Sequence, residues 1–592
     1  MTEMLHGCSE EFSRCTCFFG ESQSGKTNAA VELACRLSKK GESVLVLCAT
    51  PDGVRDVRIR LDACGIEPDL IRLSLARDAA LEVLADAHAC GMLARVPRVL
   101  DEFEERFLME DLRTLGIKGR RLCEVFEFLR AGWSRLADDD CGWLITLEEE
   151  SVSSLVRDEL RFIGGMLACE VGNLAVSALR ENADIRKRHM VDHVIVDDFS
   201  LMDYASQVFS RLLARVSLSF TASPVETNPV FDEYPCFEGS ELFLRQHESA
   251  DVVWLEAPMR PRLVRLVEKR LASSCGFAGG VHAACGFLHD EGKEGEAEDG
   301  SVCVYMEADM GEECRRIVEV CARETAAGRD VLVTGSHGLW RNNVAKALSA
   351  AGLSVVCCER PIGVRDFRDE RSCLRAMRKT LARLKENPRD GVAWRSLIGF
   401  GDYTARSAGL EELRNAVSES GEGLDEALLL LYEGRLHNVD ARSSVLAPLA
   451  ASYARGRDML ESDCVYDVWP AAVMEGGEGF IRVCSPHQAA ALRADSVVFG
   501  GFVSGAIPSR PYADGSLVGA ARRRSHLADM RMLYSVVGCA RASVTITGFS
   551  RCSLEVAERM GLRIAGIKLQ AGMRVCAIEP SEYICFFEFS EF

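Results

Sequence analysis

The stretch from residue 15 to residue 40 constrains the fold more than any other part of the chain, because a glycine loop there follows a strand and precedes a helix. Residues 15–19 (CTCFF) form an apolar run typical of a buried strand, and GESQSGKT follows directly at residues 20–27. Residues 28–40 then repeat apolar positions at helical spacing until Gly41. A strand, a GxxxxGKS/T loop and a helix in this order indicate a phosphate-binding loop in an α/β domain.

The loop predicts a nucleoside triphosphate, ATP or GTP, as ligand. Its glycines let backbone N–H groups point at the β-phosphate in front of a helix N-terminus. Lys26 is expected to reach the β- and γ-phosphates, and Thr27 to bind Mg²⁺. The predicted nucleotide-binding residues are Gly20, Glu21, Ser22, Gln23, Ser24, Gly25, Lys26 and Thr27.

A nucleotide loop needs an acidic partner at the end of a neighbouring strand, and HVIVDD at residues 193–198 has the right pattern. Asp197 is expected to bind Mg²⁺, and Asp198 to orient or deprotonate the attacking water. The alternative is an ordinary buried strand that ends in a solvated acidic turn. The distance along the chain between loop and strand does not decide between these two interpretations.

The rest of the chain alternates strand-like and helical stretches, which favours further α/β structure. Residues 43–50 (SVLVLCAT) are typical of a second buried strand, whereas residues 76–165 and 361–474 have a mainly helical periodicity. The other expected elements are strands at 252–255, 331–334, 353–358 and 480–484, and a helix at 343–351. With 592 residues, of which 48% are hydrophobic, the chain is long enough for several domains.

Composition narrows the classes of function. No segment reaches about 18 apolar residues without a charge, and the N-terminal residues show no basic and then apolar signal, so we predict a cytoplasmic protein without a membrane partner. The 25 cysteines are scattered through apolar segments, which favours buried free thiols. A net charge of −19 opposes broad nucleic-acid binding but is compatible with one narrow basic groove for a single strand.

Several segments resemble, in order, the motifs of superfamily 1 DNA helicases of the UvrD, PcrA and Rep type. After the phosphate loop, residues 44–61 (VLVLCATPDGVRDVRIRL) and 191–214 (VDHVIVDDFSLMDYASQVFSRLLA) are similar to the regions called Ia and Walker B. Four later motif regions have similar segments at residues 255–272, 386–403, 485–510 and 531–549. The resemblance covers nearly the whole chain.

This resemblance implies an α/β fold with two RecA-like P-loop domains, each built on a parallel sheet and interrupted by a mainly helical insertion. The implied first domain comprises residues 1–75 and 166–250, with its insertion at 76–165. The implied second domain comprises residues 251–360 and 475–575, with its insertion at 361–474 and a C-terminal tail at 576–592. Arg260 and Arg541 match the family's arginines near the γ-phosphate, and Arg541 is expected at the end of a helix.

The same resemblance implies an ATP-dependent DNA helicase or translocase, with ATP and Mg²⁺ bound between the two domains. Its expected substrate is single-stranded or partly duplex DNA, along which the family moves from 3′ to 5′. The expected process is DNA repair or recombination, with a protein partner in a repair complex.

Three departures from the family pattern affect the expected hydrolysis. Asp198 stands where the family has glutamate, and the missing methylene withdraws the carboxylate from the water, which predicts slow hydrolysis. Glu226 falls on a glutamine that contacts the γ-phosphate in the family. In the segment AALR, Arg493 falls on a glutamate that contacts the nucleotide sugar.

A further departure affects the expected grip on DNA, because Ala49 falls on an aromatic residue that stacks on bases in the family. Phe231 or Tyr234 would have to supply that platform. Three functions therefore stay open: a working motor, a degenerate helicase-like scaffold with little hydrolysis, and a P-loop enzyme with another substrate. DNA-stimulated ATP hydrolysis distinguishes the first from the other two.

Overall fold

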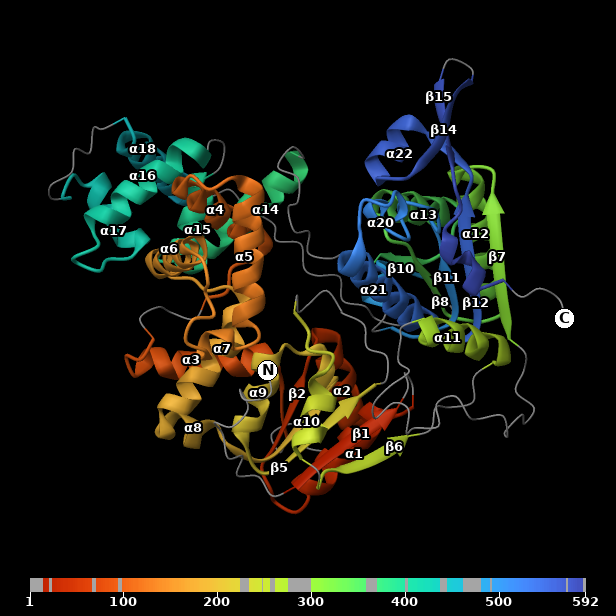
Figure 1. The fold of residues 1–592 in the computed structure, drawn as a ribbon, viewed down its shortest axis with the longest axis horizontal. Coiled ribbons are helices and arrows are strands. Elements are labelled where there is room, and N and C mark those ends of the chain that lie inside the picture. Colours follow the sequence, from red (N-terminus) through yellow and green to blue (C-terminus); the bar gives the residue numbers. More distant parts are fainter. Residues whose placement is uncertain are drawn as a thin grey trace.

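A computed structural model of the chain shows three lobes, which we call the first α/β lobe, the second α/β lobe and the helical lobe (Figure 1). The structure describes residues 14–20, 24–65, 71–93, 98–223, 234–247, 249–255, 261–274, 300–357, 370–399, 403–436, 444–461, 481–489, 492–570 and 573–588. Among these residues, no helix has the length and apolar character that a membrane crossing requires.

The first α/β lobe is built on a six-stranded parallel sheet with the order β3-β2-β4-β5-β1-β6. The strands are β1 (Arg14–Gly20), β2 (Val44–Cys48), β3 (Ile71–Leu75), β4 (Val191–Asp197), β5 (Ala214–Ala222) and β6 (Asp251–Leu255). Because side chains alternate along a strand, Val44 and Val46 of β2 face one layer of helices while Leu45 and Leu47 face the other.

Helices cover both faces of this first sheet. One layer consists of α1 (Lys26–Ser38) and α2 (Pro51–Ala63). The other layer consists of α3 (Ala76–Ala89), α7 (Ala168–Glu181) and α9 (Tyr204–Leu213), with α8 (Ala183–His189) and α10 (Gly239–Gln246) beside them.

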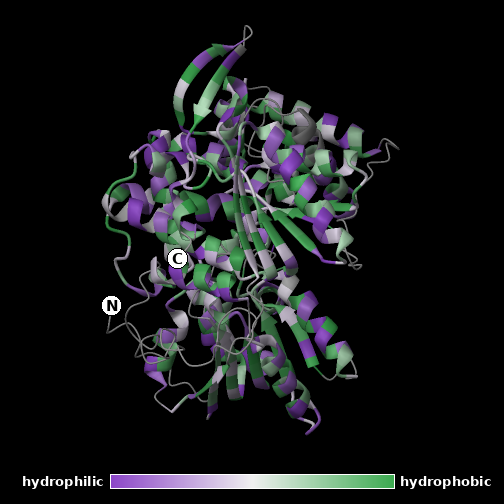
Figure 2. Cartoon of the chain, turned by 90° about the vertical axis from the view of Figure 1, so that its right-hand side faces the viewer, coloured by the Kyte–Doolittle hydropathy of each residue, from purple (hydrophilic) through white to green (hydrophobic). Residues whose placement is uncertain are grey.

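The second α/β lobe repeats this plan with a six-stranded parallel sheet in the order β7-β12-β11-β8-β10-β9. The strands are β7 (Ser301–Glu307), β8 (Val331–Thr334), β9 (Val355–Cys357), β10 (Ile481–Cys484), β11 (Ala494–Phe499) and β12 (Ala540–Phe549). Figure 2 shows both sheets as apolar layers between helices that carry their polar residues outward.

Helices also cover both faces of the second sheet. One face packs against α11 (Arg262–Ser274), the short α19 (Pro486–Ala489) and α20 (Arg510–Ala513), and α21 (Gly519–Val537). The other face packs against α12 (Met310–Ala326) and α13 (Gly338–Ala350). A small antiparallel sheet follows, with β13 (Arg551–Ser553), β15 (Met573–Ile578) and β14 (Ile564–Gln570) in this order and α22 (Leu554–Met560) beside it.

The helical lobe combines two insertions that lie far apart in the sequence (Figure 1). The first insertion contributes α4 (Glu102–Leu112), α5 (Gly119–Trp133) and α6 (Leu147–Ile163). The second contributes α14 (Glu370–Glu386), α15 (Gly391–Gly399), α16 (Tyr403–Ala416), α17 (Leu424–Tyr432) and α18 (Leu446–Glu461). Side chains from both insertions, such as Leu129, Leu160, Trp394 and Leu428, belong to one hydrophobic core.

Ion pairs reinforce this joint core. Arg395 of α15 donates to both carboxylate oxygens of Asp111 in α4, at 2.8 and 2.6 Å, and both side chains are almost fully buried. Arg414 of α16 pairs with the buried Glu159 of α6. The two insertions therefore form one packed body.

The predicted α/β class is confirmed, with two parallel sheets that are each interrupted by a helical insertion. The predicted domain boundaries need three corrections. Residues 251–255 belong to the first lobe, because β6 pairs with β1. The first insertion begins at α4 and not at residue 76, because α3 packs on the first sheet. Residues 576–588 form no separate tail, since β15 and the short helix η6 (Glu582–Phe586) pack onto the second lobe.

Candidate functional site

The predicted phosphate loop lies where β1 ends and α1 begins. Gly20 has no room for a side chain, because a Cβ atom there would lie 2.3 Å from Ser24 Oγ and 2.7 Å from the carbonyl oxygen of Leu255. Gly25 has a φ angle of 87°, in the left-handed region that glycine tolerates best. The backbone path thus requires both glycines. Glu21, Ser22 and Gln23 lie outside the described residues.

The start of α1 is suited to an anion. Its N-cap is Gly25, which has no side chain to bond the helix N–H groups, and its first turn contains no acidic residue. The buried Lys26 Nζ donates a 2.9 Å hydrogen bond to the carbonyl oxygen of Gly20. Ser24 Oγ is buried and has no hydrogen-bond partner within the described part of the chain. A phosphate group here would provide acceptors for these donors.

The start of α1 and the end of β4 bring the two predicted Mg²⁺ ligands together. Thr27 Oγ1 lies 3.3 and 3.2 Å from Oδ1 and Oδ2 of Asp197, the last residue of β4. Thr221 Oγ1, near the end of β5, donates a 2.8 Å hydrogen bond to Asp197 Oδ1. Burial and the charge of Asp198 raise the pKa of the buried Asp197, which a bound cation would reverse.

Mg²⁺ beside a nucleotide needs only one or two protein ligands, because phosphates and water complete its octahedron. A hydroxyl and a carboxylate therefore suffice at Thr27 and Asp197. The described residues contain no group of three or more His, Cys, Asp or Glu side chains that could hold a metal ion by themselves.

Asp198 makes a sharp turn directly after β4. Its φ angle is 58°, a left-handed value that aspartate adopts more readily than most residues, and its backbone N–H donates a 2.7 Å hydrogen bond to Thr221 Oγ1. Burial raises the pKa of Asp198, the charges of Lys26 and Arg493 lower it, and the charge of Asp56 raises it. Both predicted acids therefore lie beside the lysine of the loop.

Arg541 lies at the start of β12 and not at a helix end, which corrects the prediction. The preceding helix α21 ends at Val537, and Ala540 already pairs with Ala494 of β11. The β-branched and apolar run that follows Arg541 extends the strand back to this point. The Arg541 side chain is 57% exposed and lies 3.7 Å from the carboxylate of Asp495.

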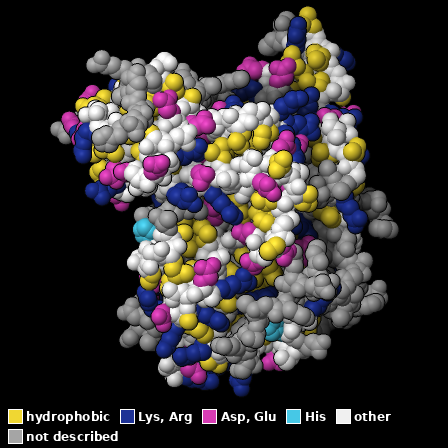
Figure 3. Space-filling view, turned by 60° about the vertical axis from the view of Figure 1, so that its left-hand side comes forward, with side chains coloured by type: hydrophobic (Ala, Val, Ile, Leu, Met, Phe, Trp, Pro, Cys, Tyr) yellow, Lys and Arg dark blue, Asp and Glu magenta, His cyan; other side chains and the backbone are white. Residues whose placement is uncertain are grey.

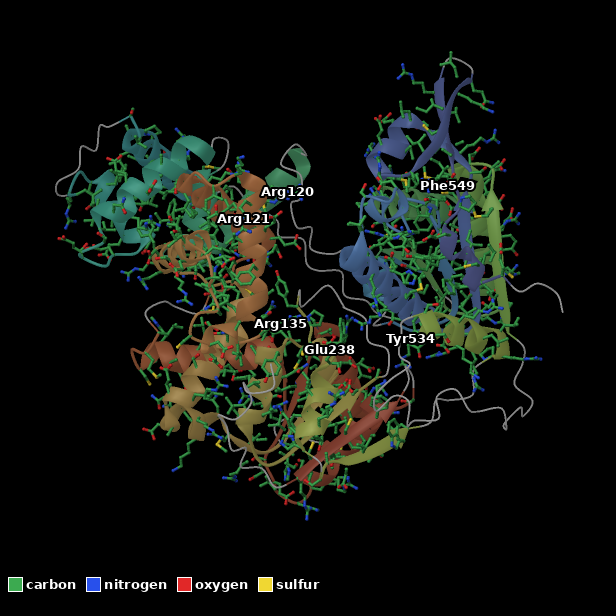
Figure 4. The ribbon with its side chains drawn as sticks, viewed as in Figure 1. Arg120, Arg121, Arg135, Glu238, Tyr534 and Phe549 are labelled. Atoms are coloured by element: carbon green, nitrogen blue, oxygen red, sulfur yellow. The ribbon has the colours of Figure 1, made fainter. Side chains whose placement is uncertain are left out.

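The starting edge of the second sheet faces the first lobe. In Figure 1 the arrows of the second sheet begin on the side nearer the first lobe, and the strands of the first sheet end toward the second lobe. The guanidinium of Arg531 on α21 lies 4.4 Å from the ring centroid of Phe237 in the first lobe. Figure 4 labels Glu238 and Tyr534, which mark the two sides of this contact.

Arg260, Glu226 and Phe231 lie outside the described residues. Tyr234 donates a hydrogen bond from its hydroxyl to Glu127, and its ring packs near the guanidinium of Arg130 on α5. The predicted stacking candidate Tyr234 is therefore engaged with the first insertion.

Thr221 contacts both acids but is not among the residues predicted from the sequence. The alternation in residues 214–222 (ARVSLSFTA) is typical of a strand, and parallel strands end at one edge of a sheet. That signal could have placed Thr221 beside Asp197. The chain matches no protein-family model and no curated protein, so its function is inferred from the arrangement of these residues.

Proposed function

We propose that this chain binds ATP with Mg²⁺ in the first α/β lobe and works as a UvrD-like translocase or helicase on single-stranded DNA. The observation that carries the proposal is the contact between Thr27 and Asp197, which are 170 residues apart and meet beside Lys26. A phosphate-loop hydroxyl next to a strand-end carboxylate is the arrangement with which P-loop NTPases hold Mg²⁺.

The presence of the second α/β lobe favours a motor function over simple nucleotide binding. Its strand-starting edge carries two arginines, Arg493 and Arg541, and faces the ends of the first sheet. A nucleotide at the ends of β1 and β4 would therefore lie on the side of the first lobe that this edge faces. Binding and hydrolysis could then change the distance between the lobes, which is how a two-lobed ATPase moves along a strand.

DNA binding does not require a basic molecule overall. On the face that Figure 3 shows, Lys and Arg side chains form separate groups among acidic ones. We propose that a flexible single strand bends between such separate basic groups, whereas a straight duplex would meet many acidic side chains. We expect strong salt dependence of the affinity for single-stranded DNA.

The test is ATP hydrolysis with and without single-stranded DNA, measured on the wild type, Lys26→Ala and Lys39→Ala. Lys26→Ala removes the cationic contact to the phosphates, so hydrolysis should be lost and ATP binding weakened. Lys39→Ala changes an exposed lysine at the other end of α1 and should leave both unchanged. Unchanged turnover in Lys26→Ala would contradict the proposal.

Direction of movement is tested on partly duplex DNA with either a 3′ or a 5′ single-stranded tail. Movement from 3′ to 5′ predicts unwinding of the substrate with the 3′ tail. A protein partner from a repair complex would be sought only after DNA-stimulated hydrolysis is established.

One observation favours a second candidate, a helicase-like scaffold with little hydrolysis. The second insertion is tied to the first by the buried pair Arg395 and Asp111 within a shared core. A motion of one insertion against the other would have to break this pair, at a cost of about 3 to 5 kcal/mol. The scaffold predicts ATP binding without DNA-stimulated hydrolysis.

A further inference from the structure

Two cysteines oppose each other in the small antiparallel sheet of the second lobe. Cys552 is the middle residue of β13, and Cys576 in β15 is its direct partner. Both are buried free thiols, and both belong to the hydrophobic core on which this sheet packs. Among the strand pairings that the structure describes, no other pair joins two cysteines.

The register gives the two cysteines a spacing that a disulfide bond accepts. Ile578 N donates a 2.8 Å hydrogen bond to the carbonyl oxygen of Ser550, which lies opposite it in the same register. Such hydrogen-bonded pairs recur at every second position of an antiparallel ladder, and Cys552 and Cys576 occupy the next one. Their Cα atoms are then expected about 5.5 Å apart, within the range of about 4.4 to 6.8 Å that disulfide bonds join. Because directly opposed residues point to the same face, the two thiols can meet without a change in strand pairing.

Burial protects the thiols while the sheet is closed. Burial and the neighbouring Cys576 raise the pKa of Cys552 to about 12, and burial also raises the pKa of Cys576, so little reactive thiolate forms near neutral pH. However, β13 is a three-residue strand at the edge of its sheet, and Arg551 and Ser553 on either side of the cysteine are exposed. Elements with so few buried residues open at a lower free energy than core strands do. Opening of β13 therefore gives reagents access to the thiols.

We propose that Cys552 and Cys576 are an oxidisable pair, which a small-molecule disulfide such as oxidised glutathione converts into an intramolecular disulfide bond. This modification site lies in the second lobe and is independent of the proposed binding of ATP and DNA.

The bond forms by two successive thiol–disulfide exchanges. In the open strand, the Cys552 thiolate attacks one sulfur of the small-molecule disulfide, so that a mixed disulfide forms, the S–S bond of the reagent breaks and one small thiol leaves. When β13 returns to the sheet, the Cys576 thiolate attacks Cys552 Sγ, which forms the protein disulfide and releases the second small thiol. The two cysteines together lose two protons and two electrons, and the reagent takes up both as it is reduced to two thiols.

The disulfide would close a loop around one structural unit. The segment between the two cysteines contains α22 and the hairpin of β14 and β15, at the outer end of the second lobe (Figure 1). Only Ser550 separates β13 from the central strand β12, so the bond also ties the base of the hairpin to the end of β12. A cross-link that closes a loop of roughly 25 residues restricts the unfolded chain and thereby stabilises the folded lobe.

The experiment treats the full-length protein with oxidised glutathione until no further change occurs, alkylates the remaining thiols in denaturant, and maps all cysteines by mass spectrometry. The expected product is a pair of peptides linked through Cys552 and Cys576, which separates after reduction with dithiothreitol. Cys321 on α12 is buried in the same core but has no cysteine opposite it in a strand, so it is the internal control and should be alkylated throughout.

A second measurement compares thermal unfolding with and without oxidised glutathione. Oxidation should raise the unfolding temperature of the wild type by about 5 °C or more. Cys552→Ala and Cys576→Ala should lose this shift, whereas Cys321→Ala should retain it.

The mapping needs no variant, so a variant that folds poorly does not obscure the result. If Cys552 and Cys576 of the wild type are alkylated or carry glutathione at the end of the reaction, they are not a disulfide-forming pair. A linked pair without a rise in unfolding temperature would show that the bond does not stabilise the folded lobe. The same rise in Cys552→Ala as in the wild type would assign the shift to other cysteines and would overturn the inference.

Discussion

At the scale of single residues, one hydroxyl group organises both acids of the nucleotide site. Thr221 Oγ1 donates to the Asp197 carboxylate and accepts from the backbone N–H of Asp198. The first bond fixes the carboxylate toward Thr27, and the second holds the left-handed turn that follows β4. Thr221 is therefore a positioning residue that acts through Asp197 and Asp198.

Thr221→Val should weaken Mg²⁺-dependent ATP binding about tenfold, because a buried N–H and a carboxylate each lose a partner worth about 1 kcal/mol or more. The measurement is ATP affinity with Mg²⁺ and with EDTA, which separates the metal-dependent part. Thr221→Ser keeps the hydroxyl and serves as the control. Equal Mg²⁺ dependence in the valine variant and the wild type would show that Thr221 is only a packing residue.

Asp198→Glu should raise the single-turnover rate of ATP hydrolysis about tenfold, because the added methylene extends the carboxylate toward the attacking water. The φ angle of 58° opposes this change slightly, since glutamate adopts a left-handed conformation less readily than aspartate. We therefore also expect a small loss of thermal stability. A fall in rate would show that the pocket is adapted to the shorter acid, and Asp198→Asn provides the reference without a carboxylate.

The site residues that could be predicted lie in short contiguous sequence motifs. Lys26, Thr27 and Asp197 could be placed because the loop and the strand-end acids are each contiguous in sequence. The strand pattern of residues 214–222 could have placed Thr221 at the same sheet edge, but its bonds to both acids arise from a neighbour in another strand and could not be predicted.

At the scale of elements, the alternation of strands and helices in the sequence predicts two sheets. The order of the strands along the chain does not predict which sheet each strand joins. β6 follows the first lobe's last helix and could equally begin the second lobe; its pairing with β1 decides the matter. Helix periodicity likewise did not separate α3, which packs on the first sheet, from α4 of the insertion.

The contact between α21 and η6 should make the second lobe sensitive to pH. Tyr583 OH lies 3.3 Å from Asp529 Oδ2 and 3.2 Å from His526 Nδ1, with Glu582 adjacent. Burial raises the pKa of Asp529 to about 7. Because the folded protein favours the protonated acid, its stabilising effect is full below the ordinary pKa of about 4 and is lost as the pH rises through about 7.

Asp529→Asn should remove this pH-dependent loss. At pH 8 the variant should unfold about 2 to 4 °C above the wild type, and the difference should shrink as the pH falls toward 4. Thermal unfolding of both proteins across this range is the measurement. A difference that does not vary with pH would mean that Asp529 is ionised in the folded protein throughout.

At the scale of the whole molecule, the helical lobe depends on a buried ion pair that joins the two insertions. Asp111→Ala should cost about 3 to 5 kcal/mol, because Arg395 would remain buried without its carboxylate. The double replacement of Asp111 by Leu and Arg395 by Met should recover most of this loss. Denaturant unfolding of the three proteins tests the prediction, and a single-variant cost below about 1 kcal/mol would contradict it.

Helical periodicity predicted two insertions, but it did not predict that they share a core. The sequence of each insertion alone predicts an amphipathic helical bundle. It does not show that apolar side chains of the two insertions, such as Leu160 and Trp394, pack in the same core. The shared core exists only when both insertions have folded and packed against each other.

The shared core also determines when the helical lobe can fold during protein synthesis. Asp111 leaves the ribosome 284 residues before Arg395, which at bacterial or eukaryotic elongation rates is roughly 15 to 60 s. In the second half of this interval the first sheet can assemble, since its last strand ends at Leu255, while the apolar faces of α4, α5 and α6 still lack half of their core. Those faces are consequently the part of the nascent chain that most needs a chaperone, and a chain truncated before α15 would expose them permanently.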